Sequence, residues 1–303
     1  MKLSLLVVTF NRPDDLLDLL QSVADQNGAA EVLEEMLVLD NGTTVDYTRC
    51  WDFVNRHQEL PIRVLRSEEN IGAAAGKNLL MREARGVTLL LLDDDAVFST
   101  AGDLASLASV LEKDFFREAK AGIVQLRVVY HDTKEPQRSA YPSKRRGPAR
   151  DTEFLTGFFA GCATLMRKEA LDRAGLYPEE FAIYMEEYDL GYRMIDAGYS
   201  IGYDPSVTIE HKESREGRLP DEKKLRQQWV NKSIVAWRYL PARYFVTTAL
   251  MWSLEYIRRV RGHPGGYVRA WRDVLRIPFV ERRTPIGPEA LAYLRTVGAR
   301  LWY

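Results

Sequence analysis

The strongest chemical signal in the 303-residue sequence is a run of three adjacent aspartates, Asp93, Asp94 and Asp95. They directly follow an apolar run in the segment LLLLDDDAVF. Adjacent carboxylates repel one another, and a divalent cation with oxygen ligands would compensate their charge. In an extended segment the first and third side chains point to the same side, so Asp93 and Asp95 could bind one ion together. The alternative is a solvated turn without a ligand.

Small residues dominate a second segment, Asn70 to Asn78, with the sequence NIGAAAGKN at the start of a predicted helix. Small side chains let a ligand approach the backbone, and the amide groups at a helix N-terminus favour anions. Lys77 would add a positive charge near a phosphate. A well-packed, alanine-rich helix explains the same stretch equally well.

Two further places carry groups that could act in proton transfer or metal binding. Glu186, Glu187 and Asp189 lie at the start of an amphipathic helix, where a carboxylate could accept a proton from an attacking hydroxyl. Acidic residues also stabilise any helix N-terminus, so a structural role is open. His211 follows a strand-like stretch and is either a structural histidine or a ligand.

Alternating strands and helices are predicted to position these groups. Apolar runs without a helical period indicate buried strands, and apolar residues at helical spacing indicate the helices between them. This pattern predicts a parallel sheet with helices on both faces, which binds ligands beyond the carboxyl ends of its strands. The predicted strands are Leu3 to Phe10, Met36 to Leu39, Ile62 to Leu65 and Val87 to Leu92, and the predicted helices run from an N-cap at Asn11 to Asn27 and from Gly72 to Arg85. The polar stretch from His131 to Arg150 is predicted to be a mobile loop.

Charge divides the chain into two parts. Residues 212–303 hold 19 Lys and Arg against 8 Asp and Glu, an excess of 11 positive charges, so residues 1–211 carry a net charge of −12. The acidic part argues against nucleic acid as a partner. In the basic part, helical faces carry interleaved aromatic and apolar residues, which suits either an anionic membrane interface, packing on the first part, or a homodimer face. The two predicted faces are Val230, Ile234 and Trp237, and Phe245, Thr248, Trp252 and Tyr256.

Cysteine content and the first residues bear on the compartment. Cys50 and Cys162 are too few for a disulfide framework and do not have metal-ligand spacing, which fits a reducing cytoplasm. The apolar run Met1 to Phe10 leads into a polar segment without a cleavage site, which favours a strand over a signal peptide. We therefore expect a cytoplasmic protein, peripheral on the inner face of the cell membrane if the membrane alternative holds.

Six segments in chain order resemble family 2 glycosyltransferases, whose catalytic domain has the GT-A fold. The resemblance runs from Leu3 to His211 and implies a GT-A catalytic domain at residues 1–211 followed by a helical C-terminal extension at residues 212–303. In its general character the sequence is similar to bacterial rhamnosyltransferases that build surface polysaccharides. The segments are VVTFNRPDDLLDLLQSV, LVLDNGTT, ENIGAAAGKN, LLLLDDDAVF, FLTGFFAGCATLMRKEALDRAGLYPEEF and YMEEYDLGYRMIDAGYSIGYDPSVTIEH.

The resemblance implies a role for each matching residue. Asp93, Asp95 and His211 would bind Mn²⁺ or Mg²⁺. Glu187 would be the catalytic base, although the family usually has Asp there, which leaves the neighbouring Glu186 and Asp189 as alternatives. The acceptor side would hold Gly161, Glu186 and Asp189, and the donor side would hold Thr9, Phe10, Arg12, Asp40, Asn70, Gly72, Lys77, Asn78, Asp93 and Asp94.

The implied reaction is an inverting, metal-dependent transfer of a hexosyl or deoxyhexosyl group without a covalent intermediate. The donor would be a nucleoside-diphosphate sugar, and the acceptor a glycan or a lipid-linked glycan in polysaccharide or glycolipid assembly. One alternative is a sugar nucleotidyltransferase, which should have a loop rich in Gly and in Lys or Arg after the first strand. The segment from Phe10 to Pro13, which follows the first strand here, is not such a loop. The other is a catalytically inactive, sugar-nucleotide-binding scaffold subunit, which the Glu in place of Asp at position 187 leaves open.

Overall fold

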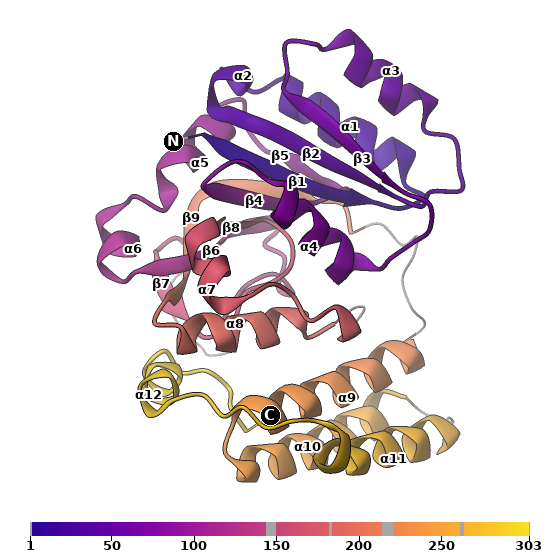
Figure 1. The fold of residues 1–303 in the computed structure, drawn as a ribbon, viewed down its shortest axis with the longest axis vertical. Coiled ribbons are helices and arrows are strands. Elements are labelled where there is room, and N and C mark those ends of the chain that lie inside the picture. Colours follow the sequence, from indigo (N-terminus) through magenta and orange to yellow (C-terminus); the bar gives the residue numbers. More distant parts are fainter. Residues whose placement is uncertain (1, 144–149, 182–183, 214–220, 261–263, 303) are drawn as a thin grey trace.

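A nine-stranded mixed sheet forms the centre of the computed structural model, which describes residues 2–143, 150–181, 184–213, 221–260 and 264–302 (Figure 1). The strand order is β3-β2-β1-β4-β8-β6-β9-β5, and β7 pairs with β9. The strands are β1 (Leu3–Thr9), β2 (Leu33–Asn41), β3 (Ile62–Ser67), β4 (Thr88–Asp93), β5 (Ala96–Phe98), β6 (Ala121–Tyr130), β7 (Phe154–Thr156), β8 (Thr164–Arg167) and β9 (Ser200–His211).

The parallel prediction holds for half of the sheet. Strands β3, β2, β1 and β4 are parallel, as predicted. Strand β8, however, runs antiparallel to both β4 and β6, and β5 and β7 run antiparallel to β9. The prediction of a parallel sheet is therefore wrong for β5, β7 and β8. A strand buried on both faces is a continuous apolar run in either direction, so the sequence pattern does not specify the direction of pairing.

Helices cover both faces of the sheet, as predicted, because successive side chains of each buried strand enter opposite cores. Leu5 and Val7 of β1 pack with helices α1, α3, α5 and α6, whereas Leu6 packs with α4, α7 and α8. These helices and the short α2 are α1 (Pro13–Ala24), α2 (Ala29–Val32), α3 (Thr48–Arg56), α4 (Ala73–Glu83), α5 (Asp103–Val110), α6 (Asp114–Glu118), α7 (Lys168–Ala174) and α8 (Glu186–Asp196), with a 3-10 turn, η1, at Glu179–Phe181.

The turn after β1 differs from the prediction. Helix α1 begins at Pro13 and its N-cap position is Arg12, so Asn11 is not the N-cap. Asn11 has a φ of 57°. Its side-chain oxygen instead accepts a hydrogen bond from the Thr44 backbone N–H at 2.8 Å, which joins the end of β1 to the loop after β2.

The first part of the segment predicted to be a mobile loop makes backbone contacts with β6. Residues 144–149 of that segment lie outside the described residues. Upstream of them, the Gln137 N–H donates to the Val128 carbonyl at 3.0 Å, and Pro136 forms a bridge with Val129. The first part of the segment therefore folds back along β6, close to the end of β9.

Four helices follow the sheet: α9 (Asp221–Tyr239), α10 (Ala242–Arg259), α11 (Pro264–Val280) and α12 (Pro288–Thr296). Helices α9, α10 and α11 pack around a core that contains Trp229, Tyr256 and Val274. Figure 1 shows α9 next to α8, with α10 and α11 on the side of α9 away from the sheet. Helix α12 returns to the sheet domain, where the Tyr293 hydroxyl donates to the Thr156 carbonyl at 3.0 Å.

The aromatic residues of the basic part lie mostly inside this helical bundle. Val230, Ile234, Trp237, Phe245 and Trp252 pack against its cores. The helical faces that the sequence offered for a membrane or a dimer are thus used for packing. Among the described helices, none is long and apolar enough to cross a bilayer.

Candidate active site

The three aspartates lie where β4 ends and turns into β5. Asp93 is the last residue of β4, and Asp94 and Asp95 form the turn. Asp94 is buried: its carboxylate accepts hydrogen bonds from the Thr9 hydroxyl at 2.8 Å and from Arg12 Nη1 at 3.0 Å. Burial raises the pKa of Asp94 to about 7, and the charge of Arg12 opposes this. Asp94 therefore fixes Thr9 and Arg12.

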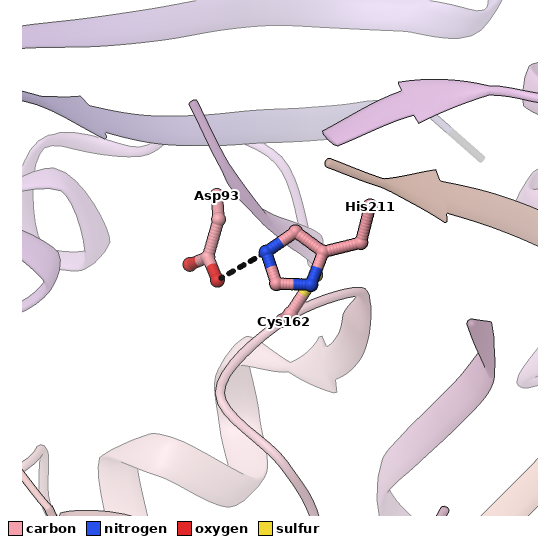
Figure 2. Close-up of side chains that lie close together, drawn as sticks. All are labelled: Asp93, Cys162 and His211. Carbon is pink, nitrogen blue, oxygen red and sulfur yellow. Dashed lines mark ion pairs between the residues drawn. The ribbon is translucent and has the colours of Figure 1, made fainter. Parts of the chain in front are cut away.

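His211 joins Asp93 and Asp95 into one group. Strand β9 pairs with β5 so that His211 lies opposite Ala96, next to the aspartate turn. Its Nε2 atom is 3.0 Å from Asp95 Oδ1. It is also 3.9 Å from Asp93 Oδ2, a pair that Figure 2 marks with a dashed line. Burial lowers the pKa of His211, but the adjacent Asp95 and Asp93 outweigh it and raise the pKa overall. Two carboxylates and an imidazole thus meet at the edge of the sheet, as the sequence predicted for these three residues.

Gln137 orients the His211 ring, and nothing in the sequence indicated it. His211 Nδ1 lies 2.9 Å from Gln137 Oε1, which accepts a hydrogen bond from the Nδ1–H group and leaves Nε2 directed at the carboxylates. Gln137 is buried, so this contact is protected from water. In metal sites, a histidine ligand commonly donates its other ring N–H to such an acceptor, which fixes the orientation of the ring.

We expect Gln137→Leu to weaken Mn²⁺ binding by roughly 10- to 100-fold, because residues that hydrogen-bond to a metal ligand have effects of that size. Electron paramagnetic resonance of free Mn²⁺ measures the affinity directly. Gln137→Glu keeps an acceptor for Nδ1 and should restore most of it. If Gln137→Leu binds Mn²⁺ as tightly as the wild type, Gln137 does not orient a ligand.

Lys77 and Glu187 form a second group, which meets at Gly161, the residue before Cys162 in the chain. A Cβ atom on Gly161 would lie 2.5 Å from Glu187 Oε1 and 3.0 Å from Lys77 Nζ, so both charged groups approach this backbone position closely. The absence of a side chain at position 161 is what allows this approach. Lys77 is buried in α4, and its pKa, which burial would lower, is raised overall by Asp93, Glu186 and Glu187.

The carboxyl group of Glu187 is poised to exchange a proton near neutral pH. The residue is partly exposed, but protein surrounds its carboxyl group, and this desolvation raises the pKa of Glu187 to about 8. The neighbouring Glu186 acts in the same direction, and Lys77 opposes both. Glu186 is buried, and its Oε2 atom has no hydrogen-bond partner among the described residues. A base with a pKa near the working pH is the most effective one.

The loops after β1, β2 and β3 form one wall of the site. Arg12 is fixed twice: its backbone N–H donates to the Tyr47 hydroxyl at 2.7 Å, and its guanidinium pairs with Asp94. Asp40 accepts hydrogen bonds from the backbone N–H and the hydroxyl of Thr43 at 3.0 and 2.7 Å. Asn70 accepts from the Gly72 N–H at 2.9 Å. Phe10 follows the last residue of β1 and is partly exposed. No pattern in the sequence indicated Tyr47.

Two residues expected at the site lie elsewhere. Asn78 is buried and donates to the Tyr177 carbonyl at 2.9 Å and to Glu179 at 3.0 Å, so it braces the segment before α8. Asp189 is buried and accepts hydrogen bonds from the Tyr239 hydroxyl at 2.9 Å and from Arg193 at 2.8 Å. Asp189 therefore fastens α9 to α8. We leave both residues out of the proposed site.

Cys162 was not predicted to belong to the site, but the structure places it there. Its sulfur lies with a ring nitrogen of His211 and a carboxylate oxygen of Asp93, and these three atoms are all within 4.8 Å of one another. Figure 2 shows Cys162 beside the imidazole ring. The spacing of the two cysteines in the sequence did not indicate this group, because Asp93, Cys162 and His211 come from distant parts of the chain and meet only in the fold.

An α/β sheet of this topology, with such groups at its strand ends, is characteristic of GT-A glycosyltransferases. The chain belongs to glycosyl transferase family 2, whose family model matches residues 4–175. This agrees with the family that the sequence segments indicated.

Curated relatives support the assignment over part of their length. The uncharacterized glycosyltransferase YwdF of Bacillus subtilis is 32% identical over 146 residues, which are 48% of this chain and 49% of the relative. The N-acetylglucosaminyl-diphospho-decaprenol L-rhamnosyltransferase of Mycobacterium tuberculosis is 34% identical over 88 residues, 29% of this chain and 28% of the relative. The match thus spans about half of YwdF and less of the rhamnosyltransferase.

Solved structures share the fold at low sequence identity. TarS 1-349 of S. aureus in complex with UDP-GlcNAc has a TM-score of 0.64 at 14% identity, with 100% of this chain and 89% of that chain covered. The mannosyltransferase PcManGT of Pyrobaculum calidifontis, in complex with GDP-Man and Mn²⁺, has a TM-score of 0.57 at 15% identity, with 100% of this chain and 81% of that chain covered. These likenesses establish the GT-A-like fold, including the C-terminal helical region.

Proposed function

We propose that the chain is an inverting, metal-dependent glycosyltransferase that moves a sugar from a nucleoside diphosphate to an acceptor hydroxyl, in polysaccharide or glycolipid assembly. The observation that carries the proposal is the presence of two neighbouring groups of ionisable side chains. Asp93, Asp95 and His211 form the first group. The carboxyl group of Glu187 and Lys77 form the second, and the charge of Asp93 acts on both of them. The structural relatives in complex with UDP-GlcNAc and with GDP-Man support a nucleotide-sugar donor.

The donor set fits a divalent cation. Two carboxylates and an imidazole nitrogen suit Mn²⁺, and the carboxylates suit Mg²⁺, which prefers oxygen ligands. Asp93 is the most accessible of the three, with a side chain that is 33% exposed, against 2% for Asp95 and 11% for His211. The cation would supply positive charge to the departing diphosphate.

The donor nucleotide would lie along the wall formed by the loops after β1, β2 and β3. Arg12 has its position set by Tyr47 and Asp94 before any ligand arrives. Phe10, Asp40, Asn70 and Gly72 would border the same wall, and the side chains of Asp40 and Asn70 accept hydrogen bonds that fix the backbone there. Thr9 is fully buried and would act indirectly, through Tyr47 and Asp94. A wall fixed in advance lowers the entropic cost of holding a nucleotide.

Glu187 would accept the proton of the acceptor hydroxyl as that oxygen attacks the anomeric carbon. Its raised pKa makes it a stronger base than an ordinary carboxylate. Gly161 would let the acceptor approach the carboxylate closely, and Glu186 would border the acceptor. A single displacement with a base on the acceptor side inverts the anomeric centre, so no covalent intermediate on the protein is required.

A panel of nucleotide sugars tests the donor assignment. The correct donor should raise the melting temperature in the presence of Mn²⁺, because a ligand at 100 times its Kd stabilises a protein by about 2.7 kcal/mol. The shift should shrink when a chelator replaces Mn²⁺. A panel that gives no shift with any uridine, guanosine or thymidine diphosphate sugar would contradict the proposal.

We also propose that an exposed surface on α10 and α11 binds an anionic lipid surface. Its apolar residues recur at helical spacing along each helix and are exposed. Phe279 is 88% exposed. This apolar surface consists of Val246, Leu250, Leu254 and Ile257 of α10 and Val268, Leu275 and Phe279 of α11.

Charge selects lipid over a second copy of the chain as the occupant of this apolar surface. Helices α10 and α11 hold six arginines and only two acidic residues, Glu255 and Asp273, both of which pair with arginines. The arginines at positions 243, 258, 259, 269, 272 and 276 are exposed. Apolar residues flanked by arginines match the interface of an anionic bilayer, whereas two identical basic surfaces repel each other. A lipid-linked acceptor would be reachable from such a position.

We expect the full-length protein to bind vesicles that contain phosphatidylglycerol and to dissociate as salt is added, because screening weakens the arginine contribution. The double variant Leu254→Gln and Phe279→Gln should lose most of this binding in sedimentation assays. Val87→Gln is the matched control, since Val87 is 57% exposed but lies before β4. Binding to neutral vesicles alone would contradict the proposal, as would a stable dimer that the double variant dissociates.

A further inference from the structure

The group formed by Asp93, Cys162 and His211 has a donor set that the proposed transfer does not need. The three residues supply one carboxylate oxygen, one sulfur and one imidazole nitrogen, all within 4.8 Å of one another. Mg²⁺ binds oxygen and has little affinity for sulfur. A sulfur in this position therefore gives the site a chemistry beyond that of a Mg²⁺ or Mn²⁺ site built from Asp93, Asp95 and His211.

Several contacts hold the backbone around Cys162 in place. The side chain of Gln125, which is fully buried in β6, donates to the Cys162 carbonyl at 2.8 Å and to the Ala163 carbonyl at 3.1 Å. Its oxygen accepts a hydrogen bond from the Ala160 N–H at 2.8 Å. Ala163 has a φ of 56°, a conformation that a non-glycine residue adopts only where its surroundings impose it. The direction of the Cys162 side chain is thus set by the fold.

The other two members are fixed as firmly. Gln137 holds the far side of the His211 ring at 2.9 Å, and Asp93 is anchored by the last backbone pairing of β4. Cys162 and His211 are almost fully buried, whereas the side chain of Asp93 is 33% exposed. Three protein ligands with an opening on one side are the arrangement of zinc sites that keep a position for an outside ligand.

We infer that Asp93, Cys162 and His211 form a binding site for a borderline divalent cation such as Zn²⁺ or Co²⁺, with the Cys162 sulfur as a direct ligand. Zn²⁺ binds sulfur at about 2.3 Å and imidazole nitrogen at about 2.0–2.1 Å, so the ligand atoms, which lie within 4.8 Å of one another, would draw closer together around the ion. On binding, the thiol loses its proton to solvent and no electron is transferred. The site overlaps the proposed Mn²⁺ or Mg²⁺ site through Asp93 and His211, so the two kinds of cation would exclude each other.

Cobalt absorption tests the inference without any transfer assay. Full-length protein titrated with Co²⁺ should develop an intense near-ultraviolet band from sulfur-to-cobalt charge transfer. Cys162→Ser and Cys162→Ala should both abolish this band. Cys50→Ser is the matched control, because Cys50 is also buried and free but lies in α3, where its thiol contacts the Pro13 carbonyl at 3.1 Å. Absence of the band in the wild type, or its survival in both Cys162 variants, would overturn the inference.

Affinities give an independent measure. Loss of a residue that hydrogen-bonds to a metal ligand lowers metal affinity by roughly 10- to 100-fold. Loss of a direct ligand in Cys162→Ser should therefore weaken Zn²⁺ binding at least about 10-fold. Mn²⁺ and Mg²⁺ affinities should change little, because these ions make little use of sulfur. An equal loss for all three ions would mean that the substitution distorts the site, and would overturn the role of the sulfur. None of these results depends on whether the chain transfers sugar, so this inference and the proposed function fail separately.

Discussion

Glu187→Gln should lower the single-turnover rate of sugar transfer by about 10²- to 10⁴-fold, which is the usual contribution of a general base. Glutamine keeps the length and volume of the side chain but cannot accept the acceptor proton. Glu187 approaches Gly161, and both belong to the acceptor side of the proposed site, so donor affinity should survive nearly unchanged. The effect should therefore fall on the chemical step and spare donor binding.

The pH profile gives a second readout for the same residue. Because the pKa of Glu187 is raised to about 8, the wild-type rate should fall as the pH drops below that pKa and the carboxylate takes up a proton. This acidic limb should disappear in Glu187→Gln. Glu186→Gln is the matched control, since Glu186 is the adjacent carboxylate and should cost less. Wild-type transfer by Glu187→Gln with an inactive Glu186→Gln would assign the base to Glu186.

Asp95→Asn should lower metal-dependent transfer by on the order of 10²- to 10³-fold, because metal ions supply several kcal/mol of charge stabilisation. Asparagine keeps the size of the side chain but removes the charge that faces His211 at 3.0 Å and Arg12 at 3.4 Å. The Mn²⁺ affinity should fall together with the rate. A melting temperature close to that of the wild type would show that the fold is intact.

Asp94→Asn is the control for Asp95→Asn. Asp94 lies in the same turn, but its contacts are with Thr9 and Arg12, so its substitution should act on donor affinity and leave Mn²⁺ affinity largely intact. Equal loss of Mn²⁺ affinity in both variants would mean that the turn, and not the Asp95 carboxylate, is what the cation requires. Unchanged Mn²⁺ binding by Asp95→Asn would contradict the proposed metal site.

The features that could be predicted from the sequence are local ones. Apolar runs indicated the strands β1 to β4. Asp40, Asp93 and Asp95 could be predicted because they come at the ends of such runs, where the buried pattern of a strand ends. His211 was recognised through the family resemblance of the segment that contains it. In each case the residue lies within a few positions of the pattern that identifies it.

The features that were missed depend on contacts between distant segments. Gln137, Tyr47 and Cys162 reach the site from loops whose own sequences carry no chemical pattern. Asp189 was misplaced because two residues along a helix turn a side chain by about 200°, which directs it away from the side that Glu187 faces and towards α9. Asn78 was misplaced because it is one residue beyond Lys77, and one residue turns a side chain by about 100°.

Nucleoside diphosphate release is the measurement that tests the central claim most directly. Full-length protein would be incubated with the nucleotide sugar that stabilises it most, Mn²⁺, and a set of glycan and lipid-linked acceptors, and followed by phosphorus and proton NMR. Our account predicts release of the nucleoside diphosphate in step with formation of a glycoside of inverted anomeric configuration, and loss of both signals in excess chelator. A nucleotide sugar that binds but stays intact with every acceptor would instead identify a binding scaffold, and undiminished transfer in chelator would contradict the metal site.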